Sequence, residues 1–182
     1  MKKNKTNKLS ISKFSLLFTV FLLYIFFSCS KTATNGSFAS IEEDTMEVNI
    51  DTTAFKKFLE TNLLPKQNIK LNTIQVKKQK ALGSGEVFYY VYAATKDKKI
   101  KVARWLNKRK NELYLNDELP DEGVLFEQSY LVCKGTGKCA PQLYKNGDER
   151  MWGCTTVVAC YAGKKNPYPD CDWSMNYIEP YK

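Results

Sequence analysis

The first 28 residues constrain most strongly what the rest of the chain can fold into, because they have the layout of an export signal. Five lysines precede an apolar run from Phe14 to Phe27, and no acidic residue lies in this segment. The run is about 14 residues long, whereas a helix that spans a membrane needs about 20. We therefore expect export and cleavage, which remove residues 1–28 from the folded domain and place the rest outside the cytoplasm.

The end of the apolar run, Phe26-Phe27-Ser28-Cys29, resembles the lipobox of bacterial lipoproteins. In that family a small residue precedes a cysteine that is diacylated and becomes the N-terminus after cleavage. Ser28 and Cys29 match the motif, whereas Phe26 and Phe27 replace the usual leucine and small residue. The resemblance implies lipidation of Cys29, for instance with palmitate, and attachment to a membrane. An ordinary secretory signal cut near Ser28 and Ser30 is the alternative.

The same resemblance implies a location in the bacterial cell envelope. Cys29 is followed by Ser30 and Lys31. Neither is the aspartate that favours retention in the inner membrane in this class of lipoproteins. We therefore expect a lipid-anchored protein of the outer membrane, in contact with the periplasm.

The net charge of +9 comes largely from the signal. Five of the 28 basic residues and none of the 19 acidic residues precede Cys29, so the mature chain has 23 basic and 19 acidic residues, a net charge of +4. The remaining lysines fall mainly beside turns, as solvated strand ends do. We therefore expect no nucleic-acid partner.

The chain divides into three parts by composition. After the signal peptide, residues 29–49 are rich in Ser, Thr, Ala and acids, and we expect them to form a flexible tether. Residues 50–182 are long enough for one domain with its own core, and they include a cysteine-rich part at 133–171.

The apolar spacing predicts one helix followed by strands. Asp51 or Thr52 can cap a helix that runs to Leu64 and stops at Pro65. A period of two then predicts strands at Leu71–Val76, Glu86–Thr95, Ile100–Leu106, Glu112–Asn116 and Val124–Cys133. Short turns between strands permit only antiparallel neighbours. The expected fold is α+β, with one N-terminal helix packed on an antiparallel β-meander and a disulfide-bonded C-terminal hairpin.

The strand Glu86–Thr95 is apolar on both sides and is therefore expected at the centre of the sheet. One face would lie under the helix and the other under the C-terminal segment. Its aromatic row could instead bind sugar or peptide, although packing is the commoner use of such rows.

An exported chain carries its cysteines into surroundings where disulfides persist. Asn146-Gly147 is a strong hairpin signal, and a two-residue loop there sets Lys145 opposite Asp148. A bulged three-residue loop, or interference from Pro141, would shift that register. The cysteines after the signal are Cys133, Cys139, Cys154, Cys160 and Cys171.

In the two-residue register, Cys139 faces Cys154 and Cys133 faces Cys160. Facing residues have α-carbons about 4.5 to 5.5 Å apart, which a disulfide can bridge. We therefore expect these two disulfides, with local closure of Cys133 on Cys139 as an alternative for the outer pair. Cys171 is left over, either as a partner for Cys160 or Cys154 or as a free reactive thiol.

Several familiar sites do not fit the sequence. Residues 135–139 imitate the end of a phosphate-binding loop, but Val132 stands at its first glycine position and Cys139 replaces the hydroxyl residue that holds magnesium. The chain has no His, and its close cysteine pairs are too widely spaced for zinc. We expect no cofactor and no metal.

The lack of His also removes the usual general base, so we expect no enzyme. Two alternatives remain open. Glu118, Asp121 and Glu122 cluster beside Pro120 and could serve an envelope hydrolase as paired carboxylates. A free Cys171 could serve a thiol-redox protein.

The aromatic C-terminal tail is the best candidate for an interaction surface, with Trp173 and Tyr177 as the positions of interest. Aromatic rings with a polar edge suit a glycan or protein ligand. Shielding of the disulfides and a sheet edge is the other interpretation of these rings, and it is the one we favour. The sequence therefore predicts a lipid-anchored envelope protein that acts as a binding or structural module.

Overall fold

Strands dominate the structure. The computed structural model describes residues 36–43, 45–64, 68–115, 125–164 and 170–181. Strands account for 51% of the structure and helices for 17%, so the chain is mostly β and the expected α+β class is wrong. Strands β1, β2, β4 and β11 form in segments where the sequence pattern predicted none, which is the main reason for the difference.

The large sheet is built around one long strand, β6. Its eight strands are β1 (Ala39–Glu42), β2 (Thr45–Val48), β3 (Leu71–Lys80), β5 (Val87–Thr95), β6 (Ile100–Arg109), β7 (Glu112–Tyr114), β8 (Tyr130–Lys134) and β11 (Asp172–Asn176). Strand β6 pairs with β5 and β8 along one part of its length and with β7 at its end, always antiparallel. The sheet is therefore not the simple meander that the sequence predicted.

A second sheet contains β4 (Leu82–Gly83), β9 (Pro141–Asn146) and β10 (Glu149–Cys154). The hairpin of β9 and β10 is antiparallel, whereas β4 runs parallel to β9. Gly83 has φ +90°, and a Cβ there would lie 2.4 Å from the carbonyl oxygen of Lys145. Only glycine permits this close approach of β4 to β9.

The helices are short. Helix α2 (Thr52–Leu63) lies where the sequence predicts it, and the Asp51 carboxylate accepts hydrogen bonds from the backbone of Thr53 and Ala54. Helix α3 (Leu125–Gln128) replaces the start of the strand expected from Val124. Helix α4 (Thr155–Tyr161) follows β10 directly. Within the residues described above, no helix has the length and apolar character needed to cross a membrane.

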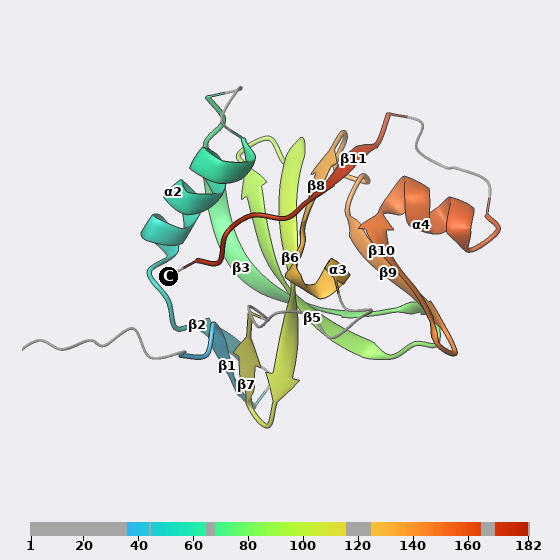
Figure 1. The fold of residues 1–182 in the computed structure, drawn as a ribbon, viewed down its shortest axis with the longest axis horizontal. Coiled ribbons are helices and arrows are strands. Elements are labelled where there is room, and N and C mark those ends of the chain that lie inside the picture. The colour runs from blue at the N-terminus through green and yellow to red at the C-terminus, as the bar shows by residue number, and fades with distance from the viewer. Residues whose placement is uncertain (1–35, 44, 65–67, 116–124, 165–169, 182) are drawn as a thin grey trace, which may run out of the picture. The chain divides into compact units, whose positions relative to one another are not determined.

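Strand β5 separates two hydrophobic cores, because its side chains alternate between them. Tyr89, Val91 and Ala93 belong to a core that also contains Phe55 and Leu59 of α2. The alternate residues of β5 belong to a core with Leu143, Trp152 and the four disulfide-bonded cysteines. Figure 1 shows α2 on one side of the large sheet and β9, β10 and α4 on the other. Strand β5 is buried on both faces, as its sequence predicts.

The expected tether at 29–49 is wrong for its second half. From Gly36 onwards the chain belongs to the compact unit, and residues 29–35 lie outside the described residues. Phe38 and Ala39 are almost fully buried, and the Phe38 amide donates to the carbonyl of Leu113 at 2.7 Å. A strand that pairs at a sheet edge needs few apolar residues, so the polar composition of this segment concealed it.

Candidate functional site

The structure contains two disulfides, and neither is one that the sequence predicted. Cys133 pairs with Cys154, with α-carbons 5.8 Å apart, and Cys139 pairs with Cys171, with α-carbons 5.2 Å apart. The expected pairs Cys139–Cys154 and Cys133–Cys160 are therefore wrong. Disulfides form and persist in oxidising surroundings, so these bonds indicate a compartment outside the cytoplasm.

Two local differences explain the altered pairing. The loop of the β9–β10 hairpin is Gly147-Asp148, so Cys154 faces Pro141 and not Cys139. The segment after Cys154 is helix α4 and not a strand, so Cys160 is turned away from Cys133. Cys160 is exposed and free.

The structure bears on one of the two alternative catalytic roles, that of Cys171. Cys171 is bonded to Cys139 and only 5% exposed, so a redox role for a free Cys171 thiol is wrong. The carboxylates Glu118, Asp121 and Glu122 lie outside the described residues, as does Cys29. Within the described part of the chain, no group of His, Cys, Asp and Glu side chains is arranged to hold a metal ion.

The loop that imitates a phosphate-binding site is held by a buried lysine. Lys101 is 1% exposed, and its ammonium donates to the carbonyl of Thr136 at 2.6 Å. It lies opposite Cys133 on the neighbouring strand. Burial lowers the pKa of Lys101, while the nearby Asp97 carboxylate opposes that shift. Lys101 therefore ties the disulfide-closed loop to the large sheet.

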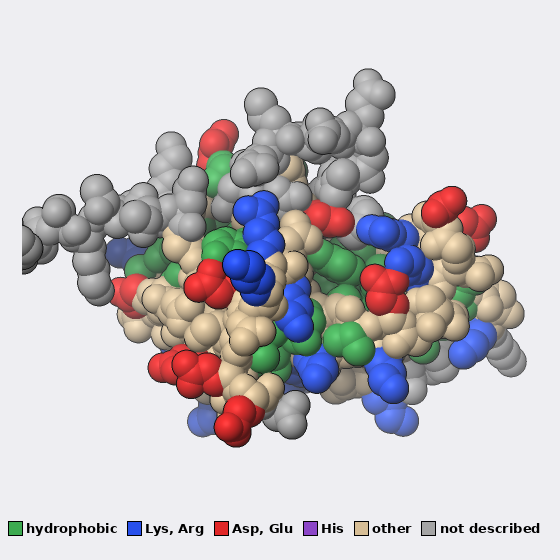
Figure 2. Space-filling view, turned by 90° about the horizontal axis from the view of Figure 1, so that it is seen from below, with side chains coloured by type: hydrophobic (Ala, Val, Ile, Leu, Met, Phe, Trp, Pro, Cys, Tyr) green, Lys and Arg blue, Asp and Glu red, His purple; other side chains and the backbone are tan. Residues whose placement is uncertain are grey.

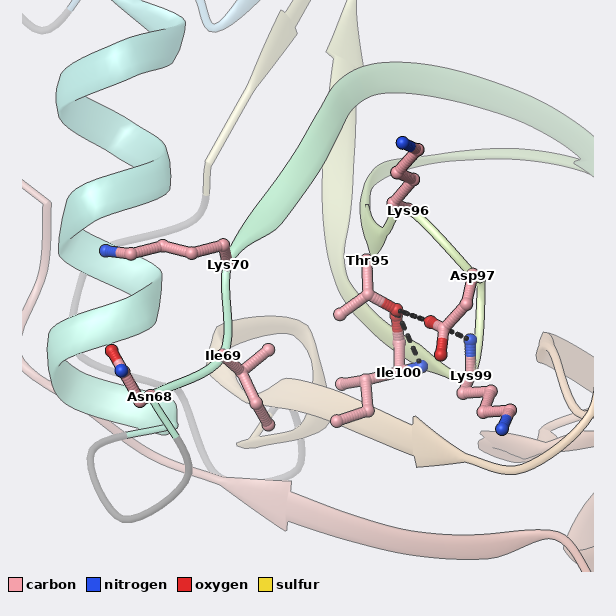
Figure 3. A pocket seen from close by; sticks show the side chains of 8 residues that line it. All are labelled: Asn68, Ile69, Lys70, Thr95, Lys96, Asp97, Lys99 and Ile100. Carbon is pink, nitrogen blue, oxygen red and sulfur yellow. Dashed lines mark hydrogen bonds between the residues drawn. The ribbon is translucent and has the colours of Figure 1, made fainter.

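A wide hollow of about 760 Å³ lies between the start of β3 and the β5–β6 turn (Figure 3). Its polar groups are engaged in local structure. The Thr95 hydroxyl donates to Asp97 at 2.6 Å, and the Lys99 amide donates to the same carboxylate at 3.1 Å. The hydrogen bond from Thr95 is the main reason that the pKa of Asp97 is lowered. Lys70 on the opposite side forms an ion pair with Glu60 at 3.0 Å. These bonds stabilise a turn and a helix end, so the hollow is a weak candidate for a ligand site.

Basic side chains do not mark out a binding face either. Figure 2 shows Lys and Arg side chains spread over one face of the molecule, with Asp and Glu side chains among them. Several basic side chains are also engaged within the protein; for example, Lys145 pairs with Glu86, and Lys77 lies over the ring of Tyr92 at 3.6 Å.

Most of the large exposed apolar residues, in contrast, lie in one short segment. Five large hydrophobic side chains are exposed among the described residues, and three of them lie in the segment 173–177 near the C-terminus. They are Trp173 at 45%, Met175 at 38% and Tyr177 at 60% exposure, which we call the β11 surface. Trp173 and Tyr177 were predicted from the sequence. Met175 was missed, although its spacing of two from each of them gave the necessary signal.

The pairing of β11 with β8 fixes how this surface is presented. Trp173 lies opposite Cys133 and Met175 opposite Leu131, so both project on the side of the disulfide-containing core. On the other side of the strand, the Asn176 amide donates to the Ser174 hydroxyl at 3.0 Å. The strand thus has one apolar and one polar row, and the apolar row reaches solvent.

No protein-family model matches the sequence, and neither a curated protein nor a solved structure is significantly similar to it.

Proposed function

We propose that this chain is a lipoprotein of the bacterial cell envelope, anchored through acyl chains on Cys29, that binds a glycan or protein ligand through the β11 surface. The observation that carries the proposal is the exposure of Trp173 and Met175 on an outermost strand and of Tyr177 directly after it. Large apolar side chains that are exposed close together are uncommon on a monomer, and they indicate a surface that is covered in use. The chain binds and does not catalyse.

The chemistry of the β11 surface limits the ligand. Trp and Tyr rings offer flat apolar faces that stack on sugar rings or on apolar side chains, and their polar edges bond to hydroxyl or amide groups. Met175 adds a flexible, polarisable contact between them. Neither nucleic acid nor a metal is part of the proposed activity.

The proposed location follows from the leader and from the residues after Cys29. The resemblance of Ser28-Cys29 to a lipobox supports acylation, and Ser30-Lys31 support the outer membrane. The disulfides agree with any oxidising compartment. A membrane anchor of this kind would hold the β11 surface close to envelope glycans and proteins.

Ligand binding is tested with purified cell-wall sacculi as the glycan probe. The chain contains three tryptophans, and Trp173 is the exposed one, so quenching of its fluorescence by acrylamide reports on the β11 surface. We expect sacculi to protect Trp173 from quenching and to retain the protein on centrifugation. Trp173→Ala and Tyr177→Ala should each reduce retention about tenfold, the equivalent of about 1.4 kcal/mol.

The matched control is Tyr161→Ala, which removes a ring of equal exposure outside the β11 surface. It should bind as the unchanged protein does. If sacculi give no retention, the same variants are compared by cross-linking to solubilised envelope proteins, which tests the protein ligand. Equal cross-linking and equal retention by all variants would refute the proposed binding role.

The anchor is tested separately by mass spectrometry of the N-terminal peptide. We expect Cys29 as its first residue, carrying the mass of a diacylglycerol. Cys29→Ser should abolish the acyl mass and release the protein from the membrane fraction. An unmodified N-terminus near Ser30 would contradict the anchor and leave an ordinary secreted protein.

A further inference from the structure

The outermost strands of the large sheet are β2, β3 and β11, and two of them carry features that prevent pairing with another chain. Strand β3 has lysines at 77, 78 and 80 and a register shift between Leu71 and Thr73. Strand β2 is four residues long and exposes Glu47. Short length, lysines and bulges are the usual protections of an edge strand.

Strand β11 has neither the lysines nor the bulge, and it is one residue longer than β2. Its five residues include no lysine and no proline, and its pairing with β8 runs without a register shift. Its neighbour among the described strands is β8 alone. No described strand pairs with its other edge, so within the described part of the chain the backbone groups there can accept a further strand.

We propose that β11 pairs antiparallel with β11 of a second copy of this chain, so that the two large sheets become continuous. The inference deepens the proposed function, on which its biological role rests, because the second copy completes the binding surface. A two-fold axis at Ser174 is the register that pairs all five residues of the strand. Such an isologous contact closes on itself and forms a dimer.

The sequence of β11 is complementary to itself in this register. Trp173 lies opposite Met175 of the partner subunit, and the contact occurs twice. Sulfur beside an aromatic ring is a favourable pair, and facing residues project on the same side of the sheet. At the strand ends, Asp172 lies opposite Asn176 of the partner subunit, so no like charges face each other.

Pairing would enlarge the β11 surface and not bury it. Strand addition covers backbone edges, whereas the Trp173 and Met175 side chains lie on a sheet face. Each copy alone presents a row one strand wide, and two copies present a patch with two tryptophans and two methionines. A five-residue strand covers less than the roughly 1,200 Å² typical of stable interfaces, so we expect the dimer chiefly where the lipid anchor concentrates the chains.

The experiment is disulfide trapping in membranes of cells that export the full chain. Cys160→Ser removes the free thiol, and Ser174→Cys places a new thiol at the proposed axis. Facing residues of an antiparallel pair lie about 4.5 to 5.5 Å apart, within reach of a disulfide. We expect a reducible species of twice the chain mass. The matched control, Ser84→Cys, puts a thiol at an exposed turn and should give at most a tenth of that yield.

Charge changes then test the register. Met175→Lys in the Ser174→Cys background should lower the trapped dimer about tenfold, because both cross-strand contacts are lost. Combining it with Trp173→Glu places opposite charges face to face and should restore the yield. Retention of the Cys133–Cys154 and Cys139–Cys171 bonds in each variant confirms the fold. A yield of trapped dimer that is the same in all of these variants would overturn the proposed pairing.

The outcomes separate this inference from the proposed function. Equal trapping of Ser174→Cys and Ser84→Cys would indicate random collision and refute the dimer. A trapped species with another mass would show that a different protein occupies the edge. In either case, ligand retention that depends on Trp173 would leave the proposed binding function intact, because that assay uses a separate readout.

Discussion

At the scale of single residues, polar groups buried in the two cores fix the position of β6. Arg104 is 2% exposed, and its guanidinium donates to the Tyr130 hydroxyl at 2.9 Å. Lys101, three positions earlier, projects into the opposite core and bonds to the loop after β8. Hydrogen bonds to a buried cation offset part of the cost of burying its charge, so these two contacts favour one register of β6 against β8.

Tyr90 gives the protein a dependence on alkaline pH. Burial raises the pKa of Tyr90 far above its ordinary value, and Tyr92 is shifted in the same direction. An unfolded tyrosine loses its proton near pH 10, whereas the folded one keeps it. The folded state then binds more protons than the unfolded state, so the free energy of unfolding falls as pH rises above about 10.

We predict that Tyr90→Phe makes this alkaline loss smaller. At pH 7 the variant should be less stable by about 1 kcal/mol, because the hydrogen bond from Tyr90 to Gln79 at 3.0 Å is lost. Above pH 10 the difference should shrink and then reverse, with Tyr92 retaining part of the slope. Urea denaturation between pH 7 and pH 11 measures the difference in the free energy of unfolding. Both proteins carry Cys160→Ser, which prevents thiol exchange.

The exposed Tyr177→Phe is the matched control and should follow the unchanged protein at every pH. Lys77 and Lys101 act in the opposite sense, because burial lowers the pKa of both. Their contribution makes stability rise as pH approaches about 10.4, the value for an unfolded lysine. The rise in stability from the two lysines is the same with and without Tyr90→Phe, so the difference between these two proteins reports on Tyr90 alone. Parallel curves for the two proteins would contradict the assigned cause.

At the scale of elements, strands with alternating polarity were predictable, and the segment after Cys154 was not. Strands β3, β5 and β6 lie where their period of two predicts them, although β3 and β6 extend further. The β-branched run at 155–158 predicts a strand, yet it forms α4. Intrinsic preferences of this kind are worth only tenths of a kcal/mol per residue, so tertiary contacts override them.

The contacts responsible for α4 begin at Thr155. Its hydroxyl lies 2.9 Å from the Lys138 carbonyl, accepts from the Ala140 amide at 3.1 Å, and its own amide donates to the Ala140 carbonyl at 2.9 Å. Val158, in the next turn, is fully buried. None of these partners is local in sequence, so pattern analysis could not reveal them.

We predict that Thr155→Ala destabilises the protein by about 1 to 3 kcal/mol, because the Ala140 amide loses its acceptor in a buried setting. Thr61→Ala, at an exposed position of α2, should change stability by less than about 0.5 kcal/mol. Urea denaturation of both variants at pH 7 measures the difference. Equal effects would show that α4 does not depend on the Thr155 contacts.

The prediction of the disulfide pairing was wrong for a related reason, which lies in the hairpin of β9 and β10. The glycine of Asn146-Gly147 is required, since Gly147 has φ +60°, but it is the first loop residue and not the second. Glycine suits the first position of a type II′ turn as well as the second of a type I′ turn. A sequence cannot choose between them, and this choice shifts the facing residues by two. The exposure of Trp173 and Tyr177 does not depend on that register, and their role as an interaction surface stays a prediction.

At the scale of the whole molecule, the N-terminal part of the domain holds distant elements together. Strand β1 pairs with both β2 and β7, and the Phe38 ring lies against Phe55 of α2 with centroids 5.3 Å apart. Leu113 of β7, which pairs with Ala39, is fully buried. The segment from Gly36 to Asn49 is thus a structural component, and its loss would expose both a strand and a core.

We predict different results for shortening the chain on either side of Gly36. Deleting residues 30–35 should change the free energy of unfolding by less than about 0.5 kcal/mol, whereas Phe38→Ala should cost about 3 to 5 kcal/mol because it empties a buried site. Deleting residues 30–49 should prevent cooperative folding, since β7 and α2 lose their neighbours. Urea denaturation and limited proteolysis of the exported proteins measure these effects. If the protein stays stable without residues 36–49, or if Phe38→Ala leaves the free energy of unfolding unchanged, this segment is a flexible tether, as its composition indicates.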